Sequence, residues 1–207
     1  MSYNLRCDTP DDGDNAWPHR ADEAAQVVVE LAPDVFGVQE GFFGMLEDLN
    51  ERLPGYTWLG QGRDGGGEGE FSAIFYRPDR LRVVSSGHFW LSSQPDTPGS
   101  IYPGASCPRM CTWAHFIGGR KEHAKEFYFF NTHLDHRSEE ARVAGALMIL
   151  ERLDEARKKR ILPAILTGDM NAWPESPAIL ALLSDSDSGP PLYDAADWLR
   201  DRGGQIG

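Results

Sequence analysis

Polar side chains that could do chemistry follow several apolar stretches, at the point where each stretch ends. "DVFGVQE" ends at Glu40, "EFYFFNTH" ends at His133, and "PAILTGDMN" ends at Asp169 and Asn171. Asn4 lies in a further short stretch, "SYNLR", near the start of the chain. Because strand ends in a layered fold can converge on one crevice, we expect these side chains to share a site.

The chemistry of such a site follows from its ligand types. Hard oxygen ligands suit Mg²⁺, with Mn²⁺ as a second possibility, and a magnesium site needs only one or two carboxylates when water and substrate phosphate complete it. A divalent ion beside a phosphate can neutralise developing charge and lower the pKa of water. The pattern therefore predicts a metal-dependent phosphoesterase.

Each residue also has a purely structural interpretation. Glu40 alone could be a solvated acid at a strand end, and Asp169 with Asn171 could close an Asx-turn. His133 could be a hydrogen-bonded histidine at a sheet edge, or His133-x-x-His136 could bind zinc, although that spacing is common. The joint occurrence favours the site, because each motif follows its own apolar strand.

Composition narrows the class of partner. The chain has 207 residues, 41% hydrophobic and 25% charged, with a formal net charge of -12. An acidic surface repels polyanions, so we expect a small phosphorylated substrate rather than long nucleic acid.

No apolar run reaches the about 18 residues needed to span a membrane. Three cysteines without a paired framework favour free thiols and a cytoplasmic location, although a leader could have been removed.

Helical and strand patterns mix along the whole length, which favours an α+β fold with a layered sheet core over a doubly wound sheet. The predicted helices are 20–31, 42–53, 139–160 and 176–184. The predicted strands are 34–40, 55–60, 70–77, 81–85, 88–91, 111–117, 126–132 and 162–169. We expect one domain over residues 1–207.

Two helices carry apolar stripes that should face the core. The stripe of 20–31 is Ala24, Val27, Val28 and Leu31. The stripe of 139–160 is Val143, Leu147, Leu150 and Leu153, with Ser138 as its N-cap.

The glycines from Gly60 to Gly65 satisfy G-x-G-x-x-G, but a dinucleotide fingerprint needs a helix directly after them. More glycine and then the strand "EFSAIFYR" follow here, so we expect a mobile hairpin loop over 60–69.

The segments "YNLR", "FGVQE", "NTHLDH" and "TGDMNAWPESP", in this order, resemble the endonuclease/exonuclease/phosphatase superfamily with its DNase I-like fold. Bacterial metal-dependent hydrolases of this type are similar in three further places. These are Trp17 with Arg20, "FWLS" with Pro95, and Pro108-Arg109 with Thr112-Trp113. The resemblance implies a four-layer αββα sandwich: two packed, mostly antiparallel sheets with outer helices.

The resemblance also implies residue roles for hydrolysis of a phosphodiester or phosphomonoester by in-line attack of water. Glu40 would be the main metal ligand, with Asn4 beside it. Asp169 would orient or deprotonate the water, Asn171 would hold the scissile phosphate, and His133 would donate to a phosphate oxygen.

Three further positions match the family's substrate contacts, namely Glu70, Arg109 and His136. Nuclease, sugar-phosphate phosphatase and sphingomyelinase-like activities all use this core, and the sequence is silent on oligomeric state.

One family element is not found in the sequence. The family closes with a strand that carries an Asp-Tyr-Ile-Phe-like segment and then Ser-Asp-His, whereas no Asp-His pair follows residue 171 here. We therefore expect a chain truncated before the final strands. The alternative function is a catalytically impaired module that binds a metal or a phosphate ligand.

Overall fold

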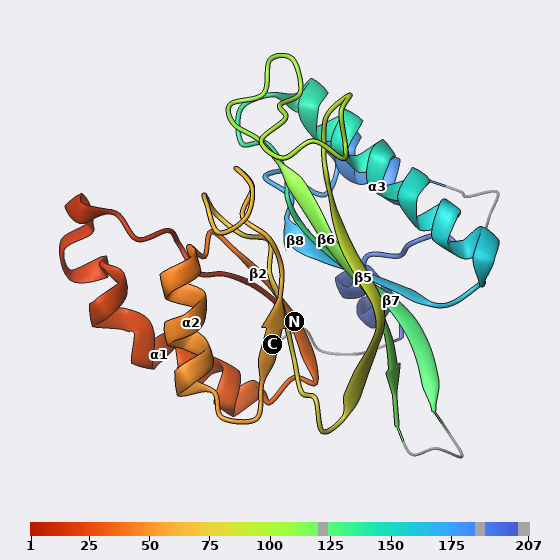
Figure 1. Cartoon of the computed structure of the whole chain (residues 1–207). Helices are drawn as coiled ribbons and strands as arrows, with labels where there is room; N and C mark the ends of the chain where they lie inside the picture. Colours follow the sequence, from red (N-terminus) through yellow and green to blue (C-terminus); the bar gives the residue numbers. More distant parts are fainter. Residues whose placement is uncertain (120–123, 185–188, 203–207) are drawn as a thin grey trace.

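Two four-stranded sheets pack face to face in a computed structural model of the chain, which describes residues 1–119, 124–184 and 189–202 (Figure 1). The first sheet has the order β1-β2-β4-β3 and the second β5-β6-β7-β8. The strands of the first are β1 (Ser2–Asn4), β2 (Val35–Gln39), β3 (Thr57–Leu59) and β4 (Ile74–Tyr76). Those of the second are β5 (Leu81–Trp90), β6 (Met110–Gly118), β7 (Lys125–His133) and β8 (Ala164–Asp169).

The pairing is mixed but mostly antiparallel. β1 pairs with β2 and β7 pairs with β8 in parallel, whereas the pairs β2–β4, β3–β4, β5–β6 and β6–β7 are antiparallel. The predicted α+β sandwich of two packed sheets is therefore confirmed.

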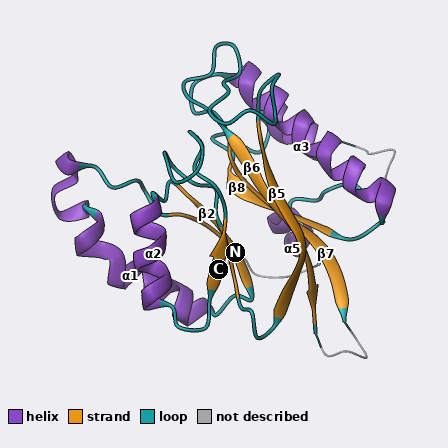
Figure 2. Ribbon diagram, viewed as in Figure 1, coloured by secondary structure: helices purple, strands orange, loops and turns teal. Residues whose placement is uncertain are grey.

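Helices cover the outer faces of the sheets (Figure 2). The apolar faces of α1 (Trp17–Leu31) and α2 (Phe43–Arg52) pack on the first sheet, and α3 (Glu139–Lys159) packs on the second. α4 (Pro177–Leu182) packs against α3. The sequence did not predict the 3-10 helix η1 (Pro10–Asn15) or α5 (Ala195–Asp201). No helix in the described ranges is long and apolar enough to cross a membrane.

The buried stripes of two helices differ from the predicted ones. Leu147 of α3 is 52% exposed and Leu31 of α1 is 64% exposed. Small residues make the closest approach instead, because Gly145 and Ala146 of α3 let the helix backbone come near the sheet. A Cβ added at Gly145 would lie 3.0 Å from Leu91. The predicted stripes are therefore right at Ala24, Val28 and Leu153, which are buried, and wrong at Leu31 and Leu147.

Other corrections concern β5 and the glycine-rich loop. β5 is one strand with a register shift between Val83 and Ser85, where two strands were predicted. The expected hairpin forms, but its loop is a compact turn closed by bonds such as Gly62 N to Gly66 O at 2.9 Å. A Cβ at Gly62 would lie 2.0 Å from Glu68 O, so this turn requires glycine.

A buried amide joins the two sheets. Asn131 of β7 is 0% exposed; its Nδ2 donates to Val38 O at 2.8 Å and to Ala73 O at 2.9 Å. Its Oδ1 accepts from Gln39 Nε2 at 2.7 Å and from Thr167 Oγ1 at 3.0 Å. All four hydrogen-bonding positions of the amide are used, so the sheets meet in one register.

We expect Asn131→Leu to lower the free energy of unfolding by about 2–4 kcal/mol, because it removes the Asn131 donor from the buried Val38 O and the Asn131 acceptor from Gln39 Nε2. Thr112→Val on the adjacent strand is the matched control, since the buried Thr112 Oγ1 has no hydrogen-bond partner among the described residues. Urea unfolding checks both variants. A stable Asn131→Leu protein would contradict the structural role of the amide.

Asp135, directly after β7, organises the start of α3. Its carboxylate is buried and accepts from Ser106 N at 2.8 Å, Ser106 Oγ at 2.5 Å, Arg137 N at 2.9 Å and Ser138 N at 2.7 Å. The Ser138 Oγ then accepts from Ala141 N at 3.1 Å, which confirms the predicted N-cap. Burial by itself would raise the pKa of Asp135, but these hydrogen bonds outweigh it and hold the pKa well below its ordinary value.

We expect Asp135→Asn to cost about 2–4 kcal/mol of unfolding free energy at neutral pH, because an amide donor would face backbone donors. A carboxyl whose pKa is lower in the folded than in the unfolded protein stabilises the folded state at pH values above its unfolded pKa of about 4. This stabilisation is lost as the pH falls through the folded pKa. The difference between parent and variant should therefore stay constant at higher pH and narrow below about pH 4.

Urea unfolding at a series of pH values measures this difference. Asp11→Asn, an exposed aspartate, is the control and should change stability by less than about 0.5 kcal/mol. A gap of the same size at every pH would show that the charge of Asp135 is not what stabilises the fold.

Candidate active site

Three of the predicted site residues meet at the ends of three strands. Glu40 follows β2, His133 ends β7 and Asp169 ends β8. One ligand atom from each of the three lies within 4.8 Å of the others. His133 Nε2 is 3.8 Å from Asp169 Oδ2. The convergence expected from the sequence is therefore present in the structure.

Asn4, at the end of β1, lies between the two carboxylates. Its Nδ2 donates to Glu40 Oε1 at 2.7 Å and to Asp169 Oδ2 at 2.9 Å, while its Oδ1 accepts from Arg6 N at 2.8 Å. The Asn4 amide donor therefore lies between the carboxylates of Glu40 and Asp169. A cation would be stabilised at the same position.

The segment after β1 holds Glu40 in place. Glu40 has a positive φ of 63°, a left-handed conformation that is uncommon outside glycine, and its Oε2 accepts from Cys7 N at 2.9 Å. Arg20 Nη1 and Nη2 donate to Leu5 O and Arg6 O. The Trp17–Arg20 motif therefore fixes the turn that presents Asn4 and Cys7 N.

Asn171 lies two residues beyond the end of β8, in the turn that follows Asp169. It has a φ of 47°, its N donates to Asp169 Oδ1 at 2.9 Å, and its Nδ2 donates to Leu134 O at 3.0 Å. An Asx-type bond is thus present and fixes one oxygen of Asp169. The other oxygen, Oδ2, remains directed to Asn4 and the cluster.

Both carboxylates are poised to be ionised. Burial would raise the pKa of Glu40, but hydrogen bonds from Asn4 and Cys7 N lower it below its ordinary value. Burial likewise opposes ionisation of Asp169, and hydrogen bonds from Asn171 N and Asn4 bring its pKa below the usual range. Two anions held this close favour a bound cation.

His133 is 8% exposed, and its surroundings disfavour the imidazolium. Burial, and then the positive charge of Arg109, lower the pKa of His133 to about 4, against the attraction of Asp169 and Glu40. At neutral pH the ring is therefore uncharged, with one N–H donor and one acceptor nitrogen.

Two of the three predicted substrate contacts, Glu70 and Arg109, line a small cleft with His133, and the third, His136, contacts Arg109. Glu70 Oε2 is 2.8 Å from Arg63 Nη1, so this glutamate is committed to an ion pair. Arg109 Nη2 is 2.9 Å from Nδ1 of His136, which is exposed.

The donor set fits a hard or borderline divalent ion. Glu40 and Asp169 offer carboxylate oxygens and His133 offers an imidazole nitrogen, a combination that Mg²⁺ and particularly Mn²⁺ accept. His136 is not in this cluster, so His133 and His136 do not form the zinc pair considered from their spacing. His136 is grouped instead with Cys107 and Asp135, where a guanidinium nitrogen already faces the imidazole.

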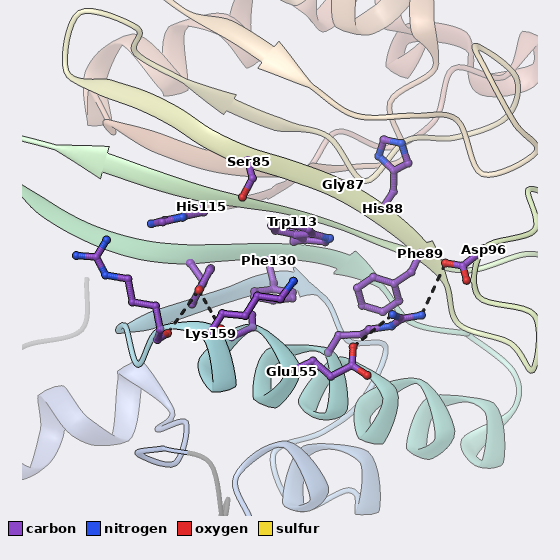
Figure 3. Close-up of a pocket in the computed structure, with 14 residues that line it drawn as sticks. Ser85, Gly87, His88, Phe89, Asp96, Trp113, His115, Phe130, Glu155 and Lys159 are labelled. Atoms are coloured by element: carbon purple, nitrogen blue, oxygen red, sulfur yellow. Dashed lines mark hydrogen bonds and ion pairs between the residues drawn. The ribbon is translucent and has the colours of Figure 1, made fainter.

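A cavity of about 500 Å³ lies away from this cluster, between the outer face of the second sheet and α3 (Figure 3). Trp113 and Phe130 form apolar walls, and Glu155 and Lys159 of α3 line its other side. None of the predicted site residues lines this cavity. We therefore place the chemistry at the strand ends.

Sequence reasoning missed two residues that shape the site. Arg63 was treated as part of a loop, and Asn131 as part of a motif without a role of its own. A polar residue inside an otherwise apolar strand, as in "EFYFFNTH", was the available signal for Asn131. No local pattern marked Arg63, because its importance comes from a contact with Glu70 across the loop.

Known proteins show the same architecture. The mannosyl-6-phosphatase of Bacteroides thetaiotaomicron is 44% identical with a TM-score of 0.83, and the match covers 87% of this chain and 67% of that one. An endonuclease/exonuclease/phosphatase from Bacteroides vulgatus is 38% identical with a TM-score of 0.84, over 89% and 70% of the two chains. The human nocturnin catalytic domain is 20% identical with a TM-score of 0.69, and the match covers 88% of this chain and 67% of that one. This similarity is one of fold.

The chain thus spans about two thirds of the length of the structures that it matches. No curated protein sequence matches it. The profile of the Endonuclease/Exonuclease/phosphatase family matches residues 1–205. The chain therefore belongs to the endonuclease/exonuclease/phosphatase family.

Proposed function

We propose that the protein is a metal-dependent phosphoric ester hydrolase that uses in-line attack of an activated water. The observation that carries the proposal is the cluster of Glu40, His133 and Asp169, which brings ligand atoms from three strand ends within 4.8 Å. Family membership supports hydrolysis in general, and the donor chemistry of the cluster supports a divalent ion.

The roles follow from the contacts of each residue. Glu40 holds the ion, and Asn4 can add its Oδ1 if the amide turns over from its present donor contacts. A divalent ion bound there would neutralise charge on the phosphate and lower the pKa of water. Asp169, ionised and fixed through one oxygen, orients or deprotonates the attacking water through the other.

Two neighbouring groups would hold the phosphate. His133 is uncharged and can donate its one N–H to a phosphate oxygen. Asn171 has one Nδ2 hydrogen engaged by Leu134 O and a second that can donate to the phosphate. Positioning and charge stabilisation of this kind are what phosphoryl transfer requires.

The substrate we propose is a small phosphorylated compound. The chain carries a net charge of -12, which disfavours long nucleic acid, and a 44% identical neighbour is named a mannosyl-6-phosphatase. A sugar phosphate is therefore a sensible first substrate to assay. Metal binding without turnover would instead favour a binding module.

We expect Asp169→Ala to lower kcat on p-nitrophenyl phosphate with Mg²⁺ or Mn²⁺ by about 10²–10⁴, because the attacking water loses its base. Excess chelator should abolish the activity of the parent. Glu23→Gln, an exposed acid of α1, serves as the control and should keep full activity. Turnover that survives chelation, or an active Asp169→Ala protein, would refute the proposal.

Glu40→Gln tests the ion separately from the reaction. Calorimetric titration with Mn²⁺ should show a dissociation constant raised at least about tenfold, because the main anionic ligand is lost. Circular dichroism should show the same fold as the parent. If Mn²⁺ binds both proteins equally, the ion is held elsewhere.

A further inference from the structure

A small cleft lies beside His133, next to the cluster that would hold the ion. Arg63 and Arg109 line it together with His133 and with Glu70, the ion-pair partner of Arg63, and Phe71 and Met110 form apolar walls. Its volume is about 10 Å³. A space of that size accepts about one water-sized atom, so it can take one oxygen of a group bound in the site but not a whole ligand.

The two guanidinium groups leave hydrogen-bonding capacity unused at this cleft. The Arg109 side chain is 8% exposed, and its Nε has no hydrogen-bond partner among the described residues. The same holds for Nε of Arg63, whose side chain is 20% exposed. A buried cationic N–H without an acceptor is costly, so the arrangement calls for an incoming anionic oxygen.

Both arginines are fixed before any ligand arrives. Arg63 O accepts from Trp90 Nε1 at 2.6 Å and from Gly99 N at 3.1 Å, and Glu70 holds its guanidinium. Leu91 N donates to Arg109 O at 2.7 Å. The "FWLS" motif therefore positions both arginines, which lowers the entropy lost on binding.

The negative charge of Asp135 does not neutralise Arg109 closely. The distance from Arg109 Nε to Asp135 Oδ2 is 3.9 Å, and that carboxylate is already engaged by Ser106 and the start of α3. Arg109 is therefore less closely paired with a carboxylate than Arg63, whose guanidinium lies 2.8 Å from Glu70.

We propose that Arg63 and Arg109 form a subsite for a free terminal phosphate oxygen, and that this cleft selects phosphomonoesters over phosphodiesters. The inference rests on the proposed hydrolase function and specifies its substrate class. A monoester presents a doubly charged phosphate with unsubstituted oxygens. A diester carries one charge less and has one unsubstituted oxygen fewer for the ion, His133 and the cleft to share. Its second ester oxygen carries a carbon and does not fit a space of one atom. Arg63 is thus a specificity-determining residue, and Glu70 positions it.

The test compares two substrates with the same leaving group, p-nitrophenyl phosphate and bis(p-nitrophenyl) phosphate, with the 207-residue chain. The wild type should prefer the monoester. The double variant Arg63→Gln/Glu70→Gln removes the ion pair without leaving a buried charge, and the monoester-to-diester ratio of kcat/KM should fall at least about tenfold. Arg77→Gln/Asp79→Asn removes an exposed pair of 2.9 Å and should leave the ratio unchanged.

A second measurement separates this inference from the proposed function. Inorganic phosphate, titrated into metal-free protein and followed by calorimetry, should bind the wild type at least about fivefold more tightly than Arg63→Gln/Glu70→Gln. If neither ester is hydrolysed but phosphate binding shows this difference, the hydrolase proposal fails and the anion subsite stands. A wild-type preference for the diester, an unchanged ratio, or equal phosphate binding would overturn the inference.

Discussion

A single buried amide determines how the two halves of this protein meet. Asn131 of β7 uses every hydrogen-bonding position of its side chain. It bonds to β2 and to Ala73, just before β4, across the space between the sheets, and to Thr167 of β8 within its own sheet. A polar group in such a core is stable only in the arrangement that satisfies it. Gly37 lies against it, where a Cβ would come 2.2 Å from the Asn131 oxygen, so this close approach of the two sheets requires glycine at that position.

The same register positions the site, because each site residue lies one or two residues from a residue of the Asn131 hydrogen-bond network. Glu40 comes one residue after Gln39, which donates to Asn131, and Asp169 comes two residues after Thr167, which also donates to it. His133 comes two residues after Asn131 itself. The residues that fix the sheets therefore also bring the strand tips together, so stability and chemistry share one constraint.

Groups of opposite charge lie on opposite sides of His133. Carboxylates with lowered pKa values form the side that suits a cation, and guanidinium groups form the side that suits an anion. The imidazole of His133 lies between them and is kept neutral by burial and by Arg109. A phosphate bound between an ion and the arginines would meet positive charge on both sides, which is the electrostatic requirement of phosphoryl transfer.

The sequence by itself predicted the layered α+β class, most strands and helices, and the convergence of Glu40, His133 and Asp169, because apolar stretches that end in polar tips are local patterns. Tertiary structure decided what depends on contacts between distant segments. It left Leu31 of α1 and Leu147 of α3 exposed, joined the two strands predicted over 81–91 into β5, and placed Arg63 beside His133. No spacing rule encodes these outcomes, since each is set by the shape and charge of a partner far away in the chain.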